Sequence, residues 1–210
     1  PLAVLRGEIE ALQDGVREAR PDTLSSLHAE AVRIGGLVED LHLLSLADSG
    51  ALACEKTVLD AADVLTETVR LFRPRIEEKG LILEMDLQET RAGARIEGNP
   101  DRLKQVFSNI LENALRYAEA RGELRVACRV EQRRIVILFE DSGPGVPPES
   151  FPRLFDRLYR VEPSRCRALG GSGLGLSICK QLVEAMDGGI EAEPSALGGL
   201  GIRITFPRKL

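Results

Sequence analysis

The amino-acid sequence predicts an α+β protein, with a helical hairpin at the N-terminus followed by a mixed β-sheet that helices cover on one face. Two observations predict this class. Apolar residues recur every three or four positions over residues 2–41, and beyond residue 56 segments of helical spacing mix with segments that alternate apolar and polar side chains. The helices and strands do not follow a regular βαβ rhythm, which favours a mixed sheet. The expected divisions are a hairpin at 1–50, a linker at 51–58 and a second domain at 59–210.

The hairpin is predicted from two apolar stripes. Leu2–Val16 and Leu27–Leu41 each step by three and four, with a break at Pro21 between them. Asp22 or Thr23 is expected to cap the second helix. Two helices of this length cannot bury both stripes by themselves, so pairing with a second copy as a four-helix bundle is the favoured completion. Docking of the hairpin on the rest of the same chain is the alternative.

The second domain is predicted from helices and strands in turn. Gly80 ends a first helix, Asn99-Pro100 begins a second, and a glycine turn precedes a third. Two of the strands are separated by a short turn and are expected to pair in antiparallel fashion. The expected helices are 60–79, 99–117 and 176–186, and the expected strands are 81–87, 124–130, 134–140, 190–193 and 201–206.

The composition excludes several classes of protein. With 43% hydrophobic and 29% charged residues, the 210-residue chain is an ordinary folded protein. Its net charge of -5 offers no basic field, so nucleic acid is not an expected partner. No stretch approaches the roughly twenty apolar residues of a membrane span, so any membrane attachment is expected upstream of residue 1. Cys54, Cys128, Cys166 and Cys179 are widely spaced, which favours free thiols in the cytoplasm over disulfides or a zinc site.

Three separated motifs carry candidate chemistry, and the first lies on the second of these helices. Asn109 and Asn113 are four residues apart, so their amide oxygens share one helix face and can share a ligand. Magnesium takes one or two ligands from protein and the rest from phosphates and water, so neutral amides suit a site crowded with phosphate. Ordinary helix polarity is the competing explanation. Glu112 points away from Asn113 in an ideal helix and could be a general base or a surface residue, of which the surface role is favoured.

The second motif is a carboxylate loop. Asp141 ends a hydrophobic strand, and Gly143 and Gly145 let the backbone approach a flat ligand closely. An adenine amino group is a fitting donor to such a carboxylate. An aspartate that satisfies its own turn is the alternative interpretation.

The third motif, Gly170–Leu176, opens directly onto the last helix, where backbone N–H groups and the helix dipole favour an anion. A flexible hinge is the alternative. Before it, Phe151–Arg160 carries arginines and aromatic anchors that suit a lid over phosphates, or a solvated charged loop. In this order the three motifs predict an ATP site. The turn is not a Walker A motif, because no Lys-Ser/Thr pair follows its glycines. It is not a dinucleotide fingerprint either, because Leu176 stands where that motif needs its third glycine.

With these motifs the chain resembles the sensor histidine kinases of two-component systems, including membrane sensors of the EnvZ and BaeS type, whose nucleotide fold is shared with gyrase, Hsp90 and MutL. The resemblance covers essentially the whole chain. It implies a dimerisation and histidine phosphotransfer hairpin followed by a catalytic α/β sandwich that binds ATP. Residues 109–117 resemble the N box, 141–145 the G1 box, 151–159 the F box, 171–175 the G2 box and 199–201 a poorer G3 box.

The resemblance implies roles for individual residues. Asn113 would bind Mg²⁺, Asn109 would assist at the phosphates and Arg116 would contact phosphate. Tyr117 would pack beside the nucleotide, and Asp141 would read adenine. ATP and Mg²⁺ would be the cofactors. The full set of expected nucleotide-binding residues is Asn109, Asn113, Arg116, Tyr117, Asp141, Gly143, Gly145, Arg160, Gly171, Gly173, Leu174, Gly175 and Leu176.

The resemblance also implies what the chain lacks. The family's acceptor motif reads His-Glu-x-Arg-Thr-Pro-Leu, and this sequence starts at Pro1-Leu2, so the acceptor histidine is expected upstream of Pro1. His28 and His42 do not stand in that motif, so the chain is not expected to phosphorylate itself. The expected parent is an inner-membrane sensor with this core in the cytoplasm. It would form a homodimer through the N-terminal helices and pass the phosphoryl group to an aspartate of a response regulator.

Two other functions stay open. The chain would serve as a dimeric interaction module switched by nucleotide, or as an ATPase of the gyrase and Hsp90 group without histidine kinase activity. Asn109 disfavours the ATPase, because those enzymes place a glutamate base at that position.

Overall fold

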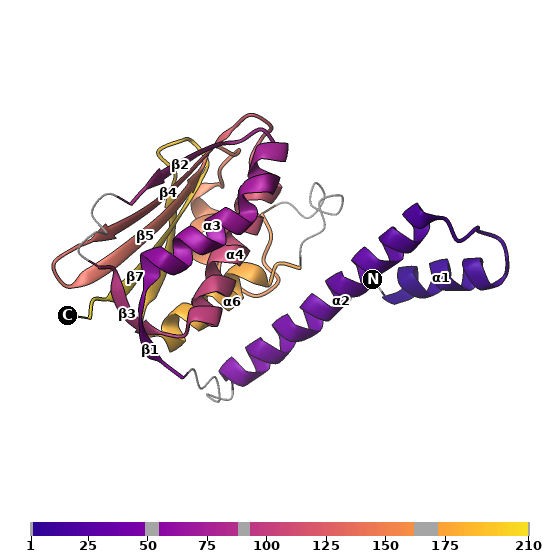
Figure 1. Ribbon diagram of the computed structural model, residues 1–210, viewed down its shortest axis with the longest axis horizontal. Coiled ribbons are helices and arrows are strands. Elements are labelled where there is room, and N and C mark those ends of the chain that lie inside the picture. The colour runs from indigo at the N-terminus through magenta and orange to yellow at the C-terminus, as the bar shows by residue number, and fades with distance from the viewer. Residues whose placement is uncertain (1, 49–54, 88–92, 162–171, 210) are drawn as a thin grey trace. The chain divides into compact units, whose positions relative to one another are not determined.

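The computed structural model describes residues 2–48, 55–87, 93–161 and 172–209 (Figure 1). The chain divides into two compact units, residues 1–49 and 50–210, and each is described by itself. Within the described residues, none of the helices has both the length and the apolar character that crossing a membrane requires.

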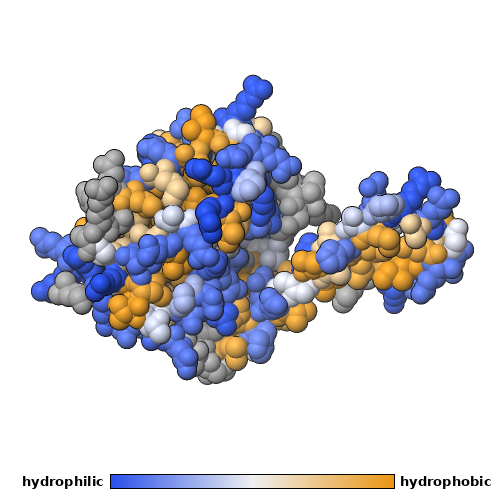
Figure 2. All heavy atoms as spheres, in the orientation of Figure 1, coloured by the Kyte–Doolittle hydropathy of each residue, from blue (hydrophilic) through white to orange (hydrophobic). Residues whose placement is uncertain are grey.

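The first unit is a hairpin of two helices, α1 (Leu2–Gln13) and α2 (Pro21–Asp48). At about 1.5 Å per residue, α1 is roughly 18 Å long and α2 roughly 42 Å, so α1 can cover less than half of α2. Figure 2 shows apolar residues gathered along the hairpin. Its large hydrophobic residues with exposed surface are Ile9, Val16, Leu24, Val32, Val38 and Leu41.

The start of α2 differs from the sequence-based expectation. The backbone N–H of Leu24 donates to the carbonyl of Arg20 at 3.0 Å, so the helix already begins at Pro21. The predicted cap at Asp22 or Thr23 is therefore wrong, because both residues lie inside the first turn. Proline suits the first helical position, since its φ is fixed near the helical value and its missing N–H would have no partner there.

The second unit is built on a five-stranded mixed sheet with the strand order β2-β4-β5-β7-β6. β2 runs parallel to β4, and the other neighbouring pairs are antiparallel. A separate antiparallel pair is formed by β1 and β3. The strands are β1 (Thr57–Asp60), β2 (Ile82–Asp86), β3 (Arg95–Gly98), β4 (Glu123–Val130), β5 (Arg134–Asp141), β6 (Gly189–Pro194) and β7 (Leu200–Pro207). The mixed sheet confirms the predicted fold class.

Three helices, α3 (Ala61–Glu78), α4 (Pro100–Tyr117) and α6 (Gly175–Ala185), lie over one face of this sheet (Figure 1). The core fills the space between helices and sheet. Phe107 of α4 and Phe139 of β5 are both buried there, with ring centroids 5.7 Å apart. Burying a side chain of this size contributes about 1.5 to 3 kcal/mol, so the contact holds α4 firmly on the sheet.

The ends of α3 and α4 follow from local side chains. Asp60 accepts the N–H of Ala62 at 2.9 Å, and Asn99 accepts the N–H of Arg102 at 3.1 Å. Each cap satisfies a backbone donor that has no partner inside the helix. Gly80, with φ of 71°, takes the left-handed conformation that ends α3. These boundaries agree with the predicted ones.

Three short elements were not predicted: β1, β3 and the 3₁₀ helix η2 (Pro148–Arg153). Each has four to six residues, too few to establish a period. β1 also begins within the range expected as a linker.

Cys128 and Cys179 are both buried, and burial raises the pKa of Cys128 to about 12. The other two cysteines, Cys54 and Cys166, lie outside the described residues.

Candidate functional site

The Asp141 carboxylate is buried at the end of β5, where the residue is only 6% exposed. Its Oδ1 accepts the backbone N–H of Gly143 at 2.9 Å and that of Leu200 at 3.2 Å. The Asp141 carbonyl accepts the N–H of Gly199 at 3.1 Å. One residue thus fastens the loop after β5 to the turn before β7. Among the described residues, both bonds to the carboxylate use Oδ1, so Oδ2 remains to accept a donor from a ligand.

Glycines are required where the backbone passes close to this carboxylate. A Cβ atom at Gly199 would overlap the Asp141 Oδ1. A Cβ atom at Gly143 would come within 3.2 Å of the Tyr117 carbonyl oxygen, at the end of α4. Gly145 has φ of 67°, in the left-handed region that glycine adopts without strain. The loop after β5 therefore lies against both the last turn of α4 and the turn before β7.

The charge of Asp141 is set by opposing influences. Burial raises the pKa of its carboxyl above the ordinary value, while the hydrogen bonds from Gly143 and Leu200 and the nearby charge of Lys79 act to lower this pKa. Burial lowers the pKa of Lys79, and the charge of Asp141 acts in the opposite direction. The Nζ atom of Lys79 donates to the carbonyl of Leu115 in α4.

The middle of α4 lies against the start of α6. The Asn109 amide nitrogen donates to the Gly175 carbonyl at 3.4 Å. Asn113 stands one turn further along α4 and is half-buried, as are Arg116 and Tyr117. From Asn109 to Tyr117 the helix rises about 12 Å. α4 thus contacts the start of α6 at its middle and the Asp141 loop at its C-terminal end.

The structure places Glu112 at the surface, as predicted. Its carboxylate forms an ion pair of 2.7 Å with Arg75 of α3, and the two side chains are 43% and 51% exposed. The pair stabilises the contact between α3 and α4 and occupies the carboxylate.

The glycine turn before α6 is joined to the residues of the expected lid. The N–H of Leu158 donates to the Gly173 carbonyl at 3.0 Å. Gly173 has φ of 72°, and a Cβ atom there would come within 3.1 Å of the Leu158 backbone. Leu174 is buried and α6 begins at Gly175, so the first N–H groups of the helix lie at the turn, as an anion site requires. Leu176 is half-buried in the first turn, and Gly171 lies outside the described residues.

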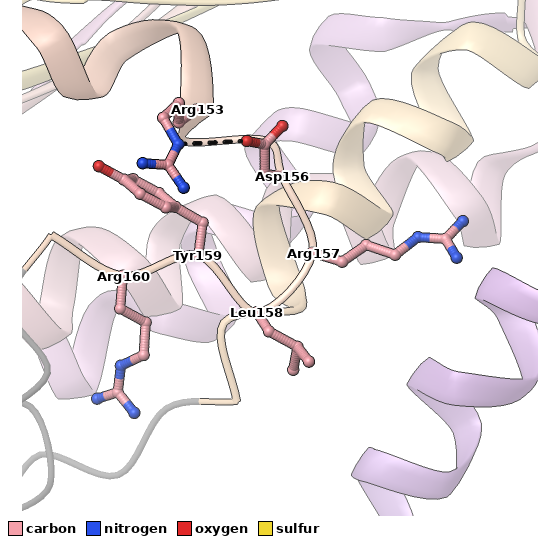
Figure 3. A pocket seen from close by; sticks show the side chains of 6 residues that line it. All are labelled: Arg153, Asp156, Arg157, Leu158, Tyr159 and Arg160. Atoms are coloured by element: carbon pink, nitrogen blue, oxygen red, sulfur yellow. Dashed lines mark ion pairs between the residues drawn. The ribbon is translucent and has the colours of Figure 1, made fainter.

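A basic pocket of about 500 Å³ is formed by residues of the expected lid (Figure 3). The guanidinium of Arg153 stacks on the ring of Tyr159, 4.3 Å from its centroid, and pairs with Asp156 at 3.6 Å. The Tyr159 hydroxyl donates to Ser150 of η2 at 3.1 Å. Figure 3 shows the side chains of Arg157 and Arg160 extending away from the Arg153–Asp156 pair. The pocket is lined by Arg153, Asp156, Arg157, Leu158, Tyr159 and Arg160.

The structure brings the predicted residues together in groups. Asp141 and Gly143 lie at the end of α4, and Gly145 lies against the turn before β7. Asn109 meets Gly175, and the lid segment that carries Arg160 meets Gly173. Sequence reasoning missed Leu200 and Lys79. Both act through contacts distant along the chain, and a lysine before a helix-ending glycine looks like an ordinary helix terminus.

Comparisons with known proteins agree with this geometry. Residues 98–210 match the family described as histidine kinase-, DNA gyrase B-, and HSP90-like ATPase. Over 207 residues the chain is 45% identical to the signal transduction histidine-protein kinase BaeS of Escherichia coli (strain K12), an alignment that covers 99% of this chain and 44% of BaeS. The chain therefore spans less than half the length of that relative.

Solved structures show the same fold. Histidine kinase AdeS of Acinetobacter baumannii has a TM-score of 0.82 at 24% identity, covering 100% of this chain and 96% of the AdeS chain. Histidine kinase ThkA, solved in complex with the response regulator protein TrrA, has a TM-score of 0.76 at 19% identity, covering 100% of this chain and 58% of that one. The family match over more than half of the chain decides the assignment: the chain belongs to the histidine kinase-, DNA gyrase B- and HSP90-like ATPases.

Proposed function

We propose that this chain is the ATP-binding catalytic core of a sensor histidine kinase. The observation that carries the proposal is the buried carboxylate of Asp141, with Oδ1 taken by two backbone donors and, among the residues that the structure describes, Oδ2 left for a ligand. The amino group of adenine is a donor that matches this oxygen. A hydrogen bond to a charged acceptor contributes about 1.5 to 3 kcal/mol, enough to select adenine.

The phosphates would bind between α4 and α6. The N–H groups at the start of α6 attract anions, and Asn109 lies against that start through Gly175. Arg116 and Arg160 would add positive charge at the phosphates. The half-buried Asn113 amide fits Mg²⁺, since its oxygen is a hard neutral ligand and phosphates and water would supply the rest. Bound Mg²⁺ would neutralise charge on the phosphates.

The proposed reaction transfers the terminal phosphoryl group of ATP to a histidine. The bond from the γ-phosphorus to the bridging oxygen breaks, a bond to an imidazole nitrogen forms, and ADP leaves. Catalysis of this kind depends on positioning and electrostatic stabilisation more than on covalent chemistry by the protein. The acceptor histidine would belong to a segment outside this chain.

The proposed partners are a second copy of the chain and a response regulator. The exposed apolar residues of the hairpin, such as Val38 and Leu41, support a homodimer, because a four-helix bundle would bury them. The complex of ThkA with a response regulator supports an aspartate of a receiver domain as the next acceptor. We place this core in the cytoplasmic part of an inner-membrane sensor.

Calorimetry and phosphotransfer test the function together. The chain should bind ATP more tightly with Mg²⁺ than without, and should bind GTP weakly. With ATP labelled at the γ-phosphate, it should label an added protein that bears the His-Glu-x-Arg-Thr-Pro-Leu motif. An interaction module would bind ATP without labelling the added protein, and an ATPase would release phosphate whether or not the acceptor is present. Either of these results would contradict the kinase.

A further inference from the structure

Lys79 connects the end of α3 to the end of α4. Its backbone N–H donates to the Arg75 carbonyl at 3.1 Å, and Gly80 then turns the chain out of the helix. Its Nζ atom donates to the carbonyl of Leu115, one of the last carbonyls of α4, which have no partner inside the helix. A cation at this end also interacts favourably with the helix dipole. Two residues later the carbonyl of Tyr117 lies against the Asp141 loop. Lys79 thus holds the part of α4 that borders the base site.

Lys79 also supplies positive charge near Asp141. Its charge opposes the effect of burial on that carboxyl. The other neighbours bring no such charge: Leu124 is the register partner of Asp141 in β4, and Leu200 donates a backbone N–H from β7. Glu140, the preceding residue, points to the opposite face of the sheet, where its carboxylate lies 3.5 Å from a guanidinium nitrogen. Within the described chain, Lys79 is the cation that acts on Asp141.

We infer that Lys79 is a positioning residue for base recognition, which holds the last turn of α4 and keeps Asp141 in the ionised form that accepts the amine of a 6-aminopurine. The inference rests on the proposed ATP site. Without the ammonium, burial would act on the carboxyl with less opposition, so Asp141 would take up a proton at a higher pH. A protonated carboxyl has lost the negative charge that strengthens the bond to the amine. Loss of Lys79 should therefore weaken ATP binding most at acid pH.

The test uses variants that separate charge from structure. Lys79→Gln keeps a donor for the Leu115 carbonyl but removes the charge, and Lys79→Arg keeps the charge. Lys104→Met is the matched control, because Lys104 of α4 also joins α3, through an ion pair of 2.8 Å with Glu67, without acting on Asp141. ATP affinity is measured by calorimetry from about pH 5 to about pH 8, with thermal unfolding of each variant.

For Lys79→Gln, ATP affinity should fall about fivefold at the acid end, with a smaller loss near pH 8, a size typical of a partly screened charge interaction. Lys79→Arg should restore the wild-type pH profile, and Lys104→Met should retain it. A Lys79→Gln profile that matches the wild type would overturn the inference. So would an equal loss at every pH, because Lys79 would then act through packing alone. Failure of the wild-type chain to bind ATP would instead refute the proposed function.

Discussion

At the scale of the single residue, stability and recognition make opposite demands on Asp141. Asn at this position keeps an oxygen for the N–H groups of Gly143 and Leu200, removes the buried charge and places an NH₂ group where Oδ2 stood. An adenine amine cannot donate to that group. We expect Asp141→Asn to weaken ATP binding about tenfold to a hundredfold, the loss of one charge-assisted hydrogen bond, in calorimetric titrations.

The same substitution should stabilise the fold. Because burial raises the folded-state pKa of Asp141, the native state binds the proton more tightly than the unfolded state does. The stability that Asp141 contributes is therefore fully present below the unfolded pKa and is lost as pH rises through the folded pKa. Asp141→Asn should raise Tm at neutral pH, with a gain that vanishes in acid.

Asp86→Asn is the control for both measurements. Asp86 pairs with Arg129 at 3.6 Å on the face of the sheet that the helices leave open. The substitution Asp86→Asn should therefore change neither ATP affinity nor Tm appreciably. A lower Tm for Asp141→Asn at neutral pH would show that the buried charge is not the dominant effect.

At the scale of the element, α4 carries the groups that the proposed site uses, and neighbouring positions on it should behave differently. Asn113→Ala removes the proposed Mg²⁺ ligand, so we expect ATP affinity to become nearly the same with and without Mg²⁺. Glu112→Ala loses only an exposed ion pair with Arg75 and should keep the full magnesium response. Titrating both variants with ATP, in Mg²⁺ and in a chelator, measures how strongly the ATP affinity of each depends on Mg²⁺. An unchanged magnesium response in Asn113→Ala would remove this residue from the site.

Sequence predicts such elements where local chemistry fixes them. α3 and α4 have amphipathic periods and capping side chains, Asp60 and Asn99, so their boundaries could be predicted closely. β1 and β3 have four residues each, and their register depends on each other across a long separation in sequence. The parallel pairing of β2 with β4 has no local signal either, because alternation reveals a strand but not its neighbour.

The same distinction between local signals and long-range contacts holds inside the site. The glycines around Asp141 marked its loop, because the spacing of aspartate and glycines is local. Leu200 and Lys79 reach the Asp141 loop and the end of α4 from distant parts of the chain, and only the folded structure brings them together.

At the scale of the whole molecule, the hairpin should bring two chains together. Leu41 is 65% exposed on α2 beyond the length that α1 can cover. Leu41→Glu would place a charge in an apolar seam, which is costly, so we expect it to shift a dimer towards monomer in light scattering. Ser26→Glu, at an exposed polar position of the same helix, should leave the mass unchanged. A wild-type chain that stays monomeric at high concentration would contradict the bundle but not the ATP site.

The last prediction concerns where the phosphoryl group goes. His28 and His42 are both exposed on α2, so access alone does not exclude them, but neither is followed by the Glu-x-x-Thr-Pro that accompanies the family's acceptor. With γ-labelled ATP we expect no label on this chain, and a phosphate that is labile in acid and stable in alkali on an added protein that carries the acceptor motif. His28→Ala is the control. Labelling of the wild-type chain that disappears in His28→Ala would make α2 itself the acceptor and would overturn the assignment of the acceptor to another segment.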